Sequence, residues 1–374
     1  MNGIYIHIPF CRQACSYCNF YFLTRRELKP LFLKGLLKEI HQHTETGSDT
    51  AVETLYIGGG TPSLLSANDI EQILEALEAS FKMNLKEFTF ECNPDDINKK
   101  YLKDLKSLGV NRISIGIQSF DSRILTFMNR AHSREHAIKA LNLIRNTGFR
   151  SFTADLIFGN PGQTIEMLEN DLNTLIGFNP PHISAYSLTI EPRTRLGKMA
   201  ELGRLEILDE SEVTGHFETV QQHLGAAGYG QYEVSNYSKP GQEALHNSNY
   251  WNHQNYFGFG PSAHSFMWTD NHKARRWNNQ SDLKAYLDNP PETEYLDLHQ
   301  LAEERIMLGL RTSSGITKQE LGERYGYRFS VRQLDWIRRQ QEHENVEWDQ
   351  TRLNLTPTGL RIADYLVVEL LSRH

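Results

Sequence analysis

The sequence predicts an α/β protein built as a partial (β/α)6 parallel barrel, followed by a small, mostly helical, winged-helix-like C-terminal module. Six short β-branched runs recur in the first half of the chain, and a helical pattern follows each of them. Polar or glycine residues also gather where these runs end, which is where parallel barrels place their chemistry. Strand–helix alternation implies a parallel sheet with helices outside it, and six units rather than eight imply an incomplete barrel.

The predicted strands share apolar, mostly β-branched residues. They are Ile4–Ile8, Thr54–Ile57, Glu87–Glu91, Arg112–Ile117, Ser151–Ile157 and Ile183–Thr189. Each precedes apolar residues at three- and four-residue spacing, which is the pattern of an amphipathic helix. After the second strand, for example, these residues are Ile70, Ile73, Leu74 and Leu77. A helical stretch from Asp209 to Ala227 closes the sixth unit.

Three segments of the chain differ in texture. Residues 1–235 hold the predicted barrel, residues 236–291 form a loop and linker rich in Asn, Gly, His and aromatics, and residues 292–374 form the C-terminal module. The last helix of that module starts near Pro357, a residue favoured in the first helical turn. From Tyr295 onward there are eleven Lys or Arg against twelve Asp or Glu. Nucleic-acid readers show a basic excess, so we expect a capping or interaction role.

The composition excludes several classes of protein. A formal net charge of −7 argues against a protein that mainly neutralises phosphate backbones, so no nucleic-acid partner is expected. No apolar run approaches the roughly 18 residues of a membrane span. The first residues have neither a basic region nor an apolar stretch of useful length, so we expect no signal peptide and a cytoplasmic protein. Only four cysteines are present, which is too few for a disulfide scaffold.

Three of the cysteines form the motif Cys11-x3-Cys15-x2-Cys18 directly after the first strand. Thiolates at such short spacing can face one cluster or metal. Three of them fill three corners of a [4Fe–4S] cubane and leave one iron open, and the amino and carboxylate groups of S-adenosylmethionine are suited to that iron. The alternatives are a zinc site completed by Cys92 or a histidine, and free structural thiols. Structural zinc normally takes four protein ligands, and we interpret Cys92 as structural.

Aromatic and apolar residues flank the cysteine motif. Tyr17, Ile8, Phe10 and Phe20 would shield a cluster and tune its potential. The motif, with an aromatic residue before its last cysteine, resembles the radical S-adenosylmethionine superfamily. The preceding phrase Tyr-Ile-His-Ile-Pro-Phe-Cys at residues 5–11 is similar to the oxygen-independent coproporphyrinogen III oxidase-like branch. The resemblance covers essentially the whole chain and implies a [4Fe–4S] cluster and S-adenosylmethionine as cofactors.

A glycine run, Gly-Gly-Gly-Thr-Pro at residues 58–62, ends the second strand. Glycines let a ligand approach the backbone, although an ordinary tight turn explains the run equally well. Charged and polar residues at the other strand ends supply an anion for an amine, a cation for a carboxylate and acceptors for ribose hydroxyls, but they also suit plain hydrogen bonding at a barrel mouth. The resemblance implies that the cofactor contacts are Tyr5, Tyr17, Gly59, Gly60, Thr61, Glu91, Gln118, Arg130, Asp155 and Ala185.

The segment His-Asn-Ser-Asn-Tyr-Trp at residues 246–251 lies in the aromatic loop. His246 could ligate heme iron while Tyr250 and Trp251 stack on a porphyrin face. A surface loop whose aromatics tuck onto the barrel explains the same residues. The segment resembles a signature of heme chaperones within the branch, which implies heme as cargo. Other candidate heme ligands are His132, His136 and His253, whereas His7, beside the cysteine loop, reads as structural.

Two features separate the chaperones of the branch from its oxidases. The oxidases have a fourth cysteine where this chain has Phe20, and they carry a long segment ahead of the cysteine motif, for which the ten residues before Cys11 leave no room. We therefore expect a heme chaperone that passes heme to a haemoprotein, such as one of the respiratory chain. The alternatives are a coproporphyrinogen III oxidase and a radical enzyme of unknown substrate. The sequence is also compatible with productive cleavage of S-adenosylmethionine, with peripheral contact with a membrane and with a homodimer.

Overall fold

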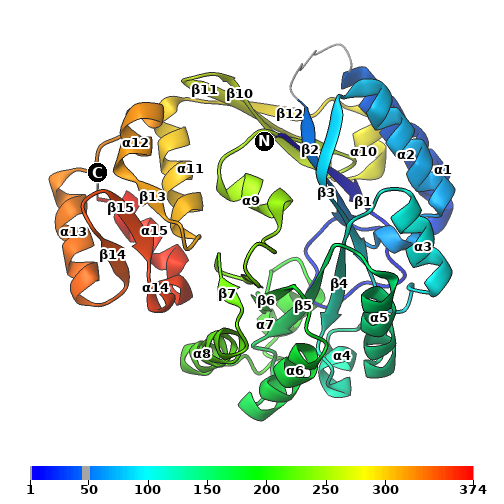
Figure 1. Cartoon of the computed structure of the whole chain (residues 1–374), viewed down its shortest axis with the longest axis horizontal. Coiled ribbons are helices and arrows are strands. Elements are labelled where there is room, and N and C mark those ends of the chain that lie inside the picture. Colours follow the sequence, from blue (N-terminus) through cyan, green and yellow to red (C-terminus); the bar gives the residue numbers. More distant parts are fainter. Residues whose placement is uncertain (1, 44–50, 374) are drawn as a thin grey trace.

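A computed structural model describes residues 2–43 and 51–373 and contains a curved sheet wrapped by helices (Figure 1). Six strands at its centre run parallel and lie side by side in chain order, which confirms the predicted parallel architecture. They are β1 (Asn2–Ile8), β2 (Val52–Gly59), β3 (Met83–Cys92), β4 (Arg112–Gln118), β5 (Ser151–Phe158) and β6 (His182–Ser187). Because the strands are parallel, their C-terminal ends meet along one edge.

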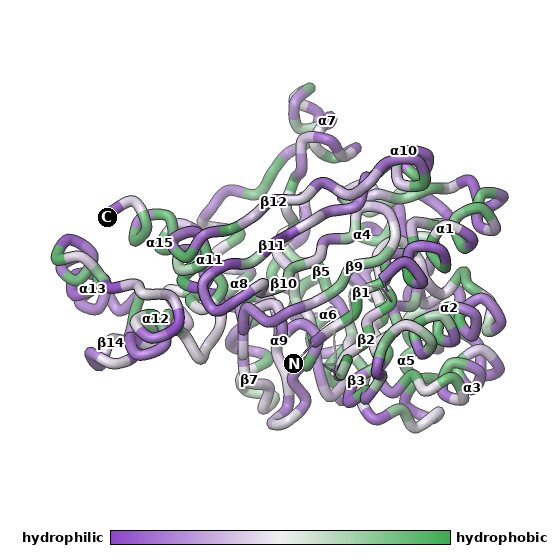
Figure 2. The backbone as a smooth tube through the Cα atoms, turned by 90° about the horizontal axis from the view of Figure 1, so that it is seen from above, coloured by the Kyte–Doolittle hydropathy of each residue, from purple (hydrophilic) through white to green (hydrophobic). Residues whose placement is uncertain are grey.

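Helices cover the outer face of these strands. The predicted ones are α1 (Lys29–Gln42), α2 (Ala67–Ser80), α3 (Lys99–Ser107), α5 (Arg134–Thr147), α6 (Ile165–Gly177) and α8 (Glu210–Ala226). Capping boxes at Ser66, Ser133 and Asp209 fix where three of them begin, because each side chain satisfies a backbone N–H of the first turn. The sequence patterns did not predict the short helices α4 (Ser122–Phe127) and α7 (Arg195–Glu201) or the 3-10 turns at Arg26–Leu28 and Pro62–Leu64. Helix α7 stands off the body of the molecule (Figure 2).

The segment after residue 235 is not the predicted loop. It contains β8 (Asn236–Ser238), α9 (Leu245–Trp251), β9 (Tyr256–Phe259), β10 (His264–Asp270), β11 (Lys273–Asn278) and α10 (Leu283–Asp288). Strand β9 pairs in parallel with β1, and β10, β11 and β12 (Glu292–Leu296) continue that sheet as an antiparallel extension. On the other side β6 pairs with β8, which pairs with β7 (Gly230–Gln231). The loop prediction is wrong because these strands are short and their Asn, Gly and His residues mask the alternating pattern.

The C-terminal module has its own hydrophobic core, centred on buried residues such as Leu301, Ile306 and Ile337. Its helices are α11 (Leu298–Leu310), α12 (Lys318–Tyr325), α13 (Val331–Glu342), α14 (Pro357–Arg361) and α15 (Ala363–Leu371). A small antiparallel sheet joins β13 (Ile316–Thr317), β15 (Arg352–Leu355) and β14 (Val346–Trp348). Helices around a small sheet match the predicted module (Figure 1). Within residues 2–43 and 51–373, no helix is both long and apolar enough to cross a membrane.

Candidate cofactor site

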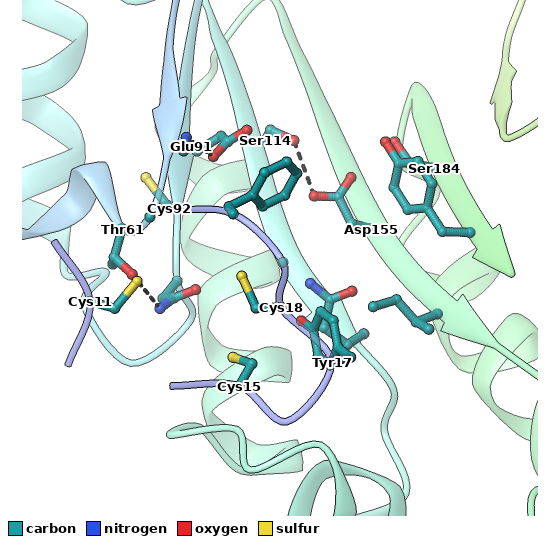
Figure 3. Close-up of a pocket in the computed structure, with 18 of the residues that line it drawn as sticks. Cys11, Cys15, Tyr17, Cys18, Thr61, Glu91, Cys92, Ser114, Asp155 and Ser184 are labelled. Carbon is teal, nitrogen blue, oxygen red and sulfur yellow. Dashed lines mark hydrogen bonds between the residues drawn. The ribbon is translucent and has the colours of Figure 1, made fainter. Parts of the chain in front are cut away.

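The loop that follows β1 places three thiols at one end of a cavity of about 490 Å³. Cys11, Cys15 and Cys18 are each partly exposed and stand apart around this end (Figure 3). Backbone hydrogen bonds tie the loop to its surroundings: the N–H of Ser16 donates to the carbonyl of Met128 at 2.9 Å, and the N–H of Leu196 donates to the carbonyl of Ser16 at 3.0 Å. The loop is therefore held against both α4 and α7, and the thiols have fixed places on the rim.

The surroundings of the thiols suit a polynuclear centre. Burial raises the pKa of Cys11 to about 11 and also raises the pKa of Cys18, so that both thiols stay protonated until a cationic centre replaces the proton. Among the described residues, no three His, Cys, Asp or Glu side chains converge closely enough to hold one metal ion. Three soft ligands spaced around an open rim fit the three protein-bound corners of a [4Fe–4S] cluster.

The glycine run brings the end of β2 against the cysteine loop. A Cβ atom on Gly60 would lie 2.8 Å from the carbonyl oxygens of both Ile8 and Phe10 and 3.1 Å from Cys11 Sγ, so only glycine fits there. Gly59 has a φ of +109°, a backbone conformation that residues other than glycine rarely adopt. Thr61, next in sequence, hydrogen-bonds Cys11. The backbone of residues 59–61 is thereby exposed to the cavity beside the thiols, as a bound ligand would require.

Two partly buried carboxyl groups face the cavity from the ends of β3 and β5, which flank β4 (Figure 3). Glu91 accepts hydrogen bonds from the Tyr56 hydroxyl at 2.6 Å and from the N–H of Gly59 at 3.0 Å. Asp155 accepts one from the Ser114 hydroxyl at 3.2 Å. Burial raises the pKa of Glu91 to about 7 and that of Asp155 to about 6, and the charge of Asp155 contributes to the shift at Glu91. Two acids whose pKa values are both raised form a site that gains from a cationic ligand.

Arg130 joins the thiols to the polar wall of the cavity. Its Nη1 lies 3.4 Å from Cys15 Sγ, and its Nη2 donates to the Asn93 side-chain oxygen and to the Gly116 carbonyl, both at 2.9 Å. Its Nε is buried and has no partner among the described residues. An unused guanidinium donor beside the thiols would suit the carboxylate of an amino acid that chelates a cluster held there.

Gln118 sits at the end of β4 in an unusual backbone conformation, with a φ of +66°. Its side-chain oxygen is buried without a partner in the described structure, although the residue lines the cavity. A strained residue with an unused polar group in a cavity is typical of a ligand contact. The Gln118 side chain therefore fits the role that the family resemblance implies for it.

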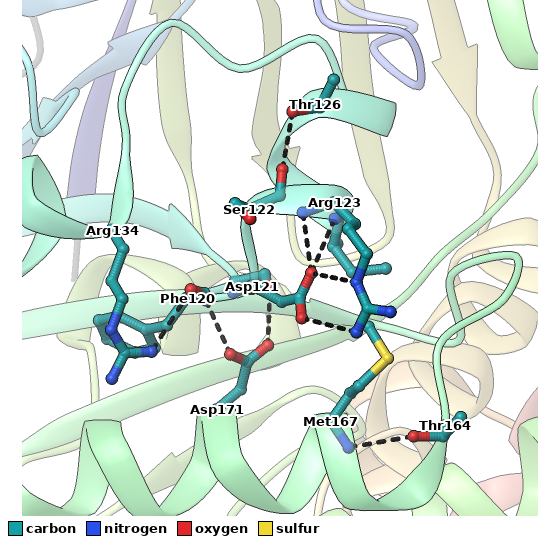
Figure 4. A network of polar contacts seen from close by, with 11 residues as sticks. Phe120, Asp121, Ser122, Arg123, Thr126, Arg134, Thr164, Met167 and Asp171 are labelled. Carbon is teal, nitrogen blue, oxygen red and sulfur yellow. Dashed lines mark hydrogen bonds and ion pairs between the residues drawn. The ribbon is translucent and has the colours of Figure 1, made fainter.

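A carboxylate on α6 holds the turn that follows Gln118 (Figure 4). Asp171 accepts hydrogen bonds from the Ser119 hydroxyl at 2.5 Å and from the N–H of Phe120 at 2.7 Å, and Arg134 lies over the Phe120 ring. Sequence reasoning missed Asp171. A buried acid in the middle of an otherwise amphipathic helix was the available signal.

We expect Asp171→Ala to weaken S-adenosylmethionine binding about tenfold without changing the iron content, because the turn loses both of its anchors. The two stranded donors should also lower the free energy of unfolding by about 2–3 kcal/mol. Equilibrium binding and denaturant unfolding measure the two effects. Glu166→Ala, an exposed change on the same helix, is the control. Wild-type affinity in Asp171→Ala would show that the turn does not position Gln118.

The cavity unites most of the predicted cofactor contacts. Those that line it are Tyr17, Gly59, Gly60, Thr61, Glu91, Gln118, Arg130 and Asp155. Tyr5 and Ala185 lie outside this lining; Ala185 belongs to the hydrophobic core, and the Tyr5 hydroxyl bonds the ring of His7 at 3.1 Å. The other ring nitrogen of His7 bonds the carbonyl of Tyr21 at 2.9 Å, so His7 braces the loop as expected. Cys92 is buried and lines the same cavity.

His246, Tyr250 and Trp251 lie in packing and hydrogen-bonding positions around α9. His246 is 1% exposed, and its ring nitrogens bond Thr54 Oγ1 at 2.9 Å and the Tyr250 hydroxyl at 2.8 Å. Burial lowers its pKa to about 3. Arg311 lies over the ring of Trp251. These side chains fasten α9 to β2 and to the C-terminal module, and in this arrangement neither nitrogen of His246 is open to a heme iron.

The other histidine candidates are also engaged. His132 bonds the carbonyl of Ile117 at 3.0 Å, and His136 closes the capping box of α5 with Ser133. His253 is buried; its Nδ1 lies 3.1 Å from the Tyr325 hydroxyl, and its Nε2 lies 3.3 Å from a carboxylate oxygen of Glu304. Its ring therefore bridges the barrel and the C-terminal module. None of these three rings stands open at the mouth of the cavity.

We expect His246→Ala to lower the free energy of unfolding by about 2–4 kcal/mol, because it leaves a cavity and removes the partner of the Tyr250 hydroxyl, while Thr54 Oγ1 keeps only its bond from Asn249. Denaturant unfolding measures this change, with the exposed His272→Ala as the control. A variant with wild-type stability that no longer takes up heme would restore the ligand role of His246.

Comparisons with known proteins give two family matches. The radical SAM superfamily matches residues 5–175, and the HemN C-terminal domain matches residues 296–362. The heme chaperone HemW of Bacillus subtilis is 35% identical over 337 residues, 87% of each chain. The HemW of Lactococcus lactis is 31% identical over 97% of this chain and 95% of its own length. The structure of coproporphyrinogen III oxidase (HemN) from Escherichia coli superposes with a TM-score of 0.85 at 22% identity, covering 99% of this chain and 89% of that one, which shows a shared fold.

Proposed function

The chain belongs to the HemW family of heme chaperones within the radical SAM superfamily, and on that premise we propose that it binds heme and hands it to haemoproteins. Its cofactors are a [4Fe–4S] cluster and S-adenosylmethionine, with heme as cargo. The observation that supports this proposal most is the single cavity that joins three thiols to the acids of β3 and β5 and to the Gln118 amide of β4. The cysteine loop alone would support only a metal site.

The proposed cofactor contacts follow from the chemistry of the cavity wall. Cys11, Cys15 and Cys18 hold the cluster, which supplies low-potential electrons when bound. Arg130 and Gln118, each with a buried unused polar atom, bind the carboxylate and other polar groups of S-adenosylmethionine. The acids Glu91 and Asp155 attract its cationic part, while the exposed backbone of residues 59–61 accepts the close approach of the ligand.

The oxidase function remains the second candidate, because the structure shares the fold of HemN. The residue after the cluster motif favours the chaperone. Phe20 is 69% exposed at the mouth of the cavity, where the resemblance places a fourth cysteine in the oxidases. An exposed aromatic ring beside a cavity offers a stacking surface to a planar porphyrin and offers no thiolate.

The proposal extends to the setting of the reaction. The recipient is a haemoprotein, such as one of the respiratory chain, and the protein works in the cytoplasm. Self-association as a homodimer and contact with the membrane surface are further parts of the proposal, each open to sizing columns and vesicle flotation.

Anaerobic reconstitution of the cluster followed by two assays tests the function. Heme uptake is followed by the Soret band, and coproporphyrinogen turnover is followed by the appearance of decarboxylated product. We expect heme uptake at stoichiometric heme and no turnover above the rate without protein. Turnover that depends on S-adenosylmethionine would overturn the chaperone proposal in favour of the oxidase.

A further inference from the structure

The cavity continues past the acid pair toward the middle of the barrel. Thr89 and Arg112 are partners across β3 and β4, and Thr153 and His182 are partners across β5 and β6. All four line the cavity, and each lies two residues before a residue of the acid level, which holds Glu91, Ser114, Asp155 and Ser184. Side chains two residues apart on a strand share a face, so these four form a second level deeper in the barrel. None of them is among the predicted cofactor contacts.

Arg112 places a buried cation at this level. It is 3% exposed, and its guanidinium donates to Thr153 Oγ1 at 2.5 Å, to Ser151 Oγ at 3.1 Å and to the carbonyl of Gln242 at 3.5 Å. All of these acceptors are neutral, and in the described part of the chain Arg112 has no ion pair. By contrast, Arg12 at the outer end of the cavity pairs with carboxylates. A buried charge without a counter-ion is costly, which favours an anionic ligand here.

Asp155, the acid whose pKa responds to the charge of Arg112, does not form an ion pair with it. The guanidinium lowers the pKa of Asp155, but Asp155 takes its hydrogen bonds from Ser114 and Ser184 at the level above. The arginine therefore acts on Asp155 through space and keeps its own contacts with neutral groups.

Two further polar groups at this level have unused atoms. Thr89 and His182 are each 1% exposed, and Thr89 Oγ1 and His182 Nδ1 have no partner within residues 2–43 and 51–373. Each such group costs about 1–3 kcal/mol when it stays unpaired. Groups of this kind, aimed into a cavity beside a buried cation, are the contacts that a ligand would complete.

The contacts of Tyr232 favour one tautomer of His182. The Tyr232 hydroxyl oxygen accepts the N–H of Ala244 at 3.4 Å and lies 2.8 Å from His182 Nε2. A hydroxyl proton directed at Nε2 leaves the proton of the ring on Nδ1, the unpartnered atom, and we assign this tautomer to the ring. Burial and the charge of Arg112 lower the pKa of His182 well below its ordinary value, so the ring is a neutral donor.

We propose that this deeper level, lined by Thr89, Arg112 and His182, binds the carboxylate group of a small molecule. A guanidinium fork with two neutral donors matches a planar carboxylate. The acids one level above repel a doubly charged phosphate more than a singly charged carboxylate. The carboxylate belongs either to a free small acid or to a propionate of heme. In the second case the inference rests on the proposed function.

Calorimetric titration of the full chain with its reconstituted cluster tests the site. The probes are sodium propionate, sodium chloride at equal ionic strength, heme and heme dimethyl ester. We expect propionate to bind and chloride not to bind. Arg112→Gln should weaken propionate binding at least about tenfold, and Arg150→Gln, an exposed change of the same kind, should leave it unchanged.

Thr89→Val is a second variant that distinguishes loss of the binding site from loss of folding. The Thr89 hydroxyl has no partner to lose, so this isosteric change should keep or raise the unfolding temperature while weakening propionate binding about threefold or more. Two results together would identify the ligand as a heme propionate. The first is that Arg112→Gln weakens the binding of heme but not of propionate, and the second is that heme dimethyl ester binds the wild type more weakly than heme by the same factor.

Carboxylate binding that is equal in wild type, Arg112→Gln and Thr89→Val would overturn the inference, as would a wild type that binds none of the carboxylate probes. A wild type that binds propionate through Arg112 but takes up no heme would instead contradict the proposed function and leave the site standing.

Discussion

Cys15→Ala removes the iron–sulfur cluster from this protein. Two thiolates hold only two corners of a cubane, and the remaining irons then lie open to solvent and oxidant. After anaerobic reconstitution, the wild type should contain about four irons and four sulfides per chain, and the variant should contain close to none. Iron and sulfide analysis, with the visible absorption of the cluster, measures this loss.

Cys92→Ala is the matched control within the same chain. Cys92 is buried, and burial raises its pKa well above the ordinary value, so it stays a protonated thiol in the wall of the cavity. We expect this variant to keep its iron and to lose only packing energy. Loss of iron in Cys92→Ala, or a full cluster in Cys15→Ala, would contradict the assignment of the three ligands.

Glu91→Gln should weaken S-adenosylmethionine binding by about two orders of magnitude. The carboxylate is buried opposite a second acid, and a cationic ligand relieves the repulsion between the two. The amide keeps the shape of the side chain but offers no charge. Equilibrium dialysis of the reconstituted protein measures the affinity, and Glu71→Gln on the exposed face of α2 is the control.

The same change should stabilise the protein without its ligand. The pKa of Glu91 in the folded chain is about 7, against an ordinary value of 4.5, so the folded state prefers the protonated form. The contribution of this preference to the free energy of unfolding is complete below about pH 4.5 and is lost as the pH rises through 7. Above pH 7 the ionised group costs the wild type about 1–3 kcal/mol, which Glu91→Gln removes. Thermal unfolding should show a small gain from Glu91→Gln at pH 5 and a larger gain at pH 8.

The affinity for S-adenosylmethionine should follow the same titration. Glu91 must lose its proton to pair with a cation, so binding should strengthen as the pH rises toward 7 and then level off. In Glu91→Gln this part of the pH dependence should disappear. A pH profile that is identical in both proteins would show that Glu91 does not face the cationic part of the ligand.

Much of the fold could be predicted from local patterns. The six parallel strands are apolar runs between amphipathic helices. The three clustered cysteines are recognised by their spacing, and the glycine run is recognised because close approach of the backbone requires glycine. Gly60 illustrates the second case, since its environment leaves no room for a Cβ atom. Such residues are visible in a sequence because their constraint is local.

The remaining features depend on contacts between distant segments. Strand β9 has only four residues, and its partner is β1, more than 240 residues earlier, so no local pattern predicts it. His246 looks like a ligand in sequence because its partner Thr54 is equally remote. Arg112 belongs to a predicted strand, but its neutral partners come from β5 and from residue 242, so no local pattern shows that its guanidinium lines the cavity with neutral partners.

Transfer of heme to an acceptor protein is the decisive measurement of the proposed chaperone function. The reconstituted chain is loaded with one heme and mixed with increasing amounts of a heme-free respiratory haemoprotein, and the Soret band of the acceptor is followed over time. We expect a transfer rate that rises with the acceptor concentration, because heme passes within a complex of the two proteins. A rate that is the same at every acceptor concentration, set by spontaneous loss of heme, would contradict it.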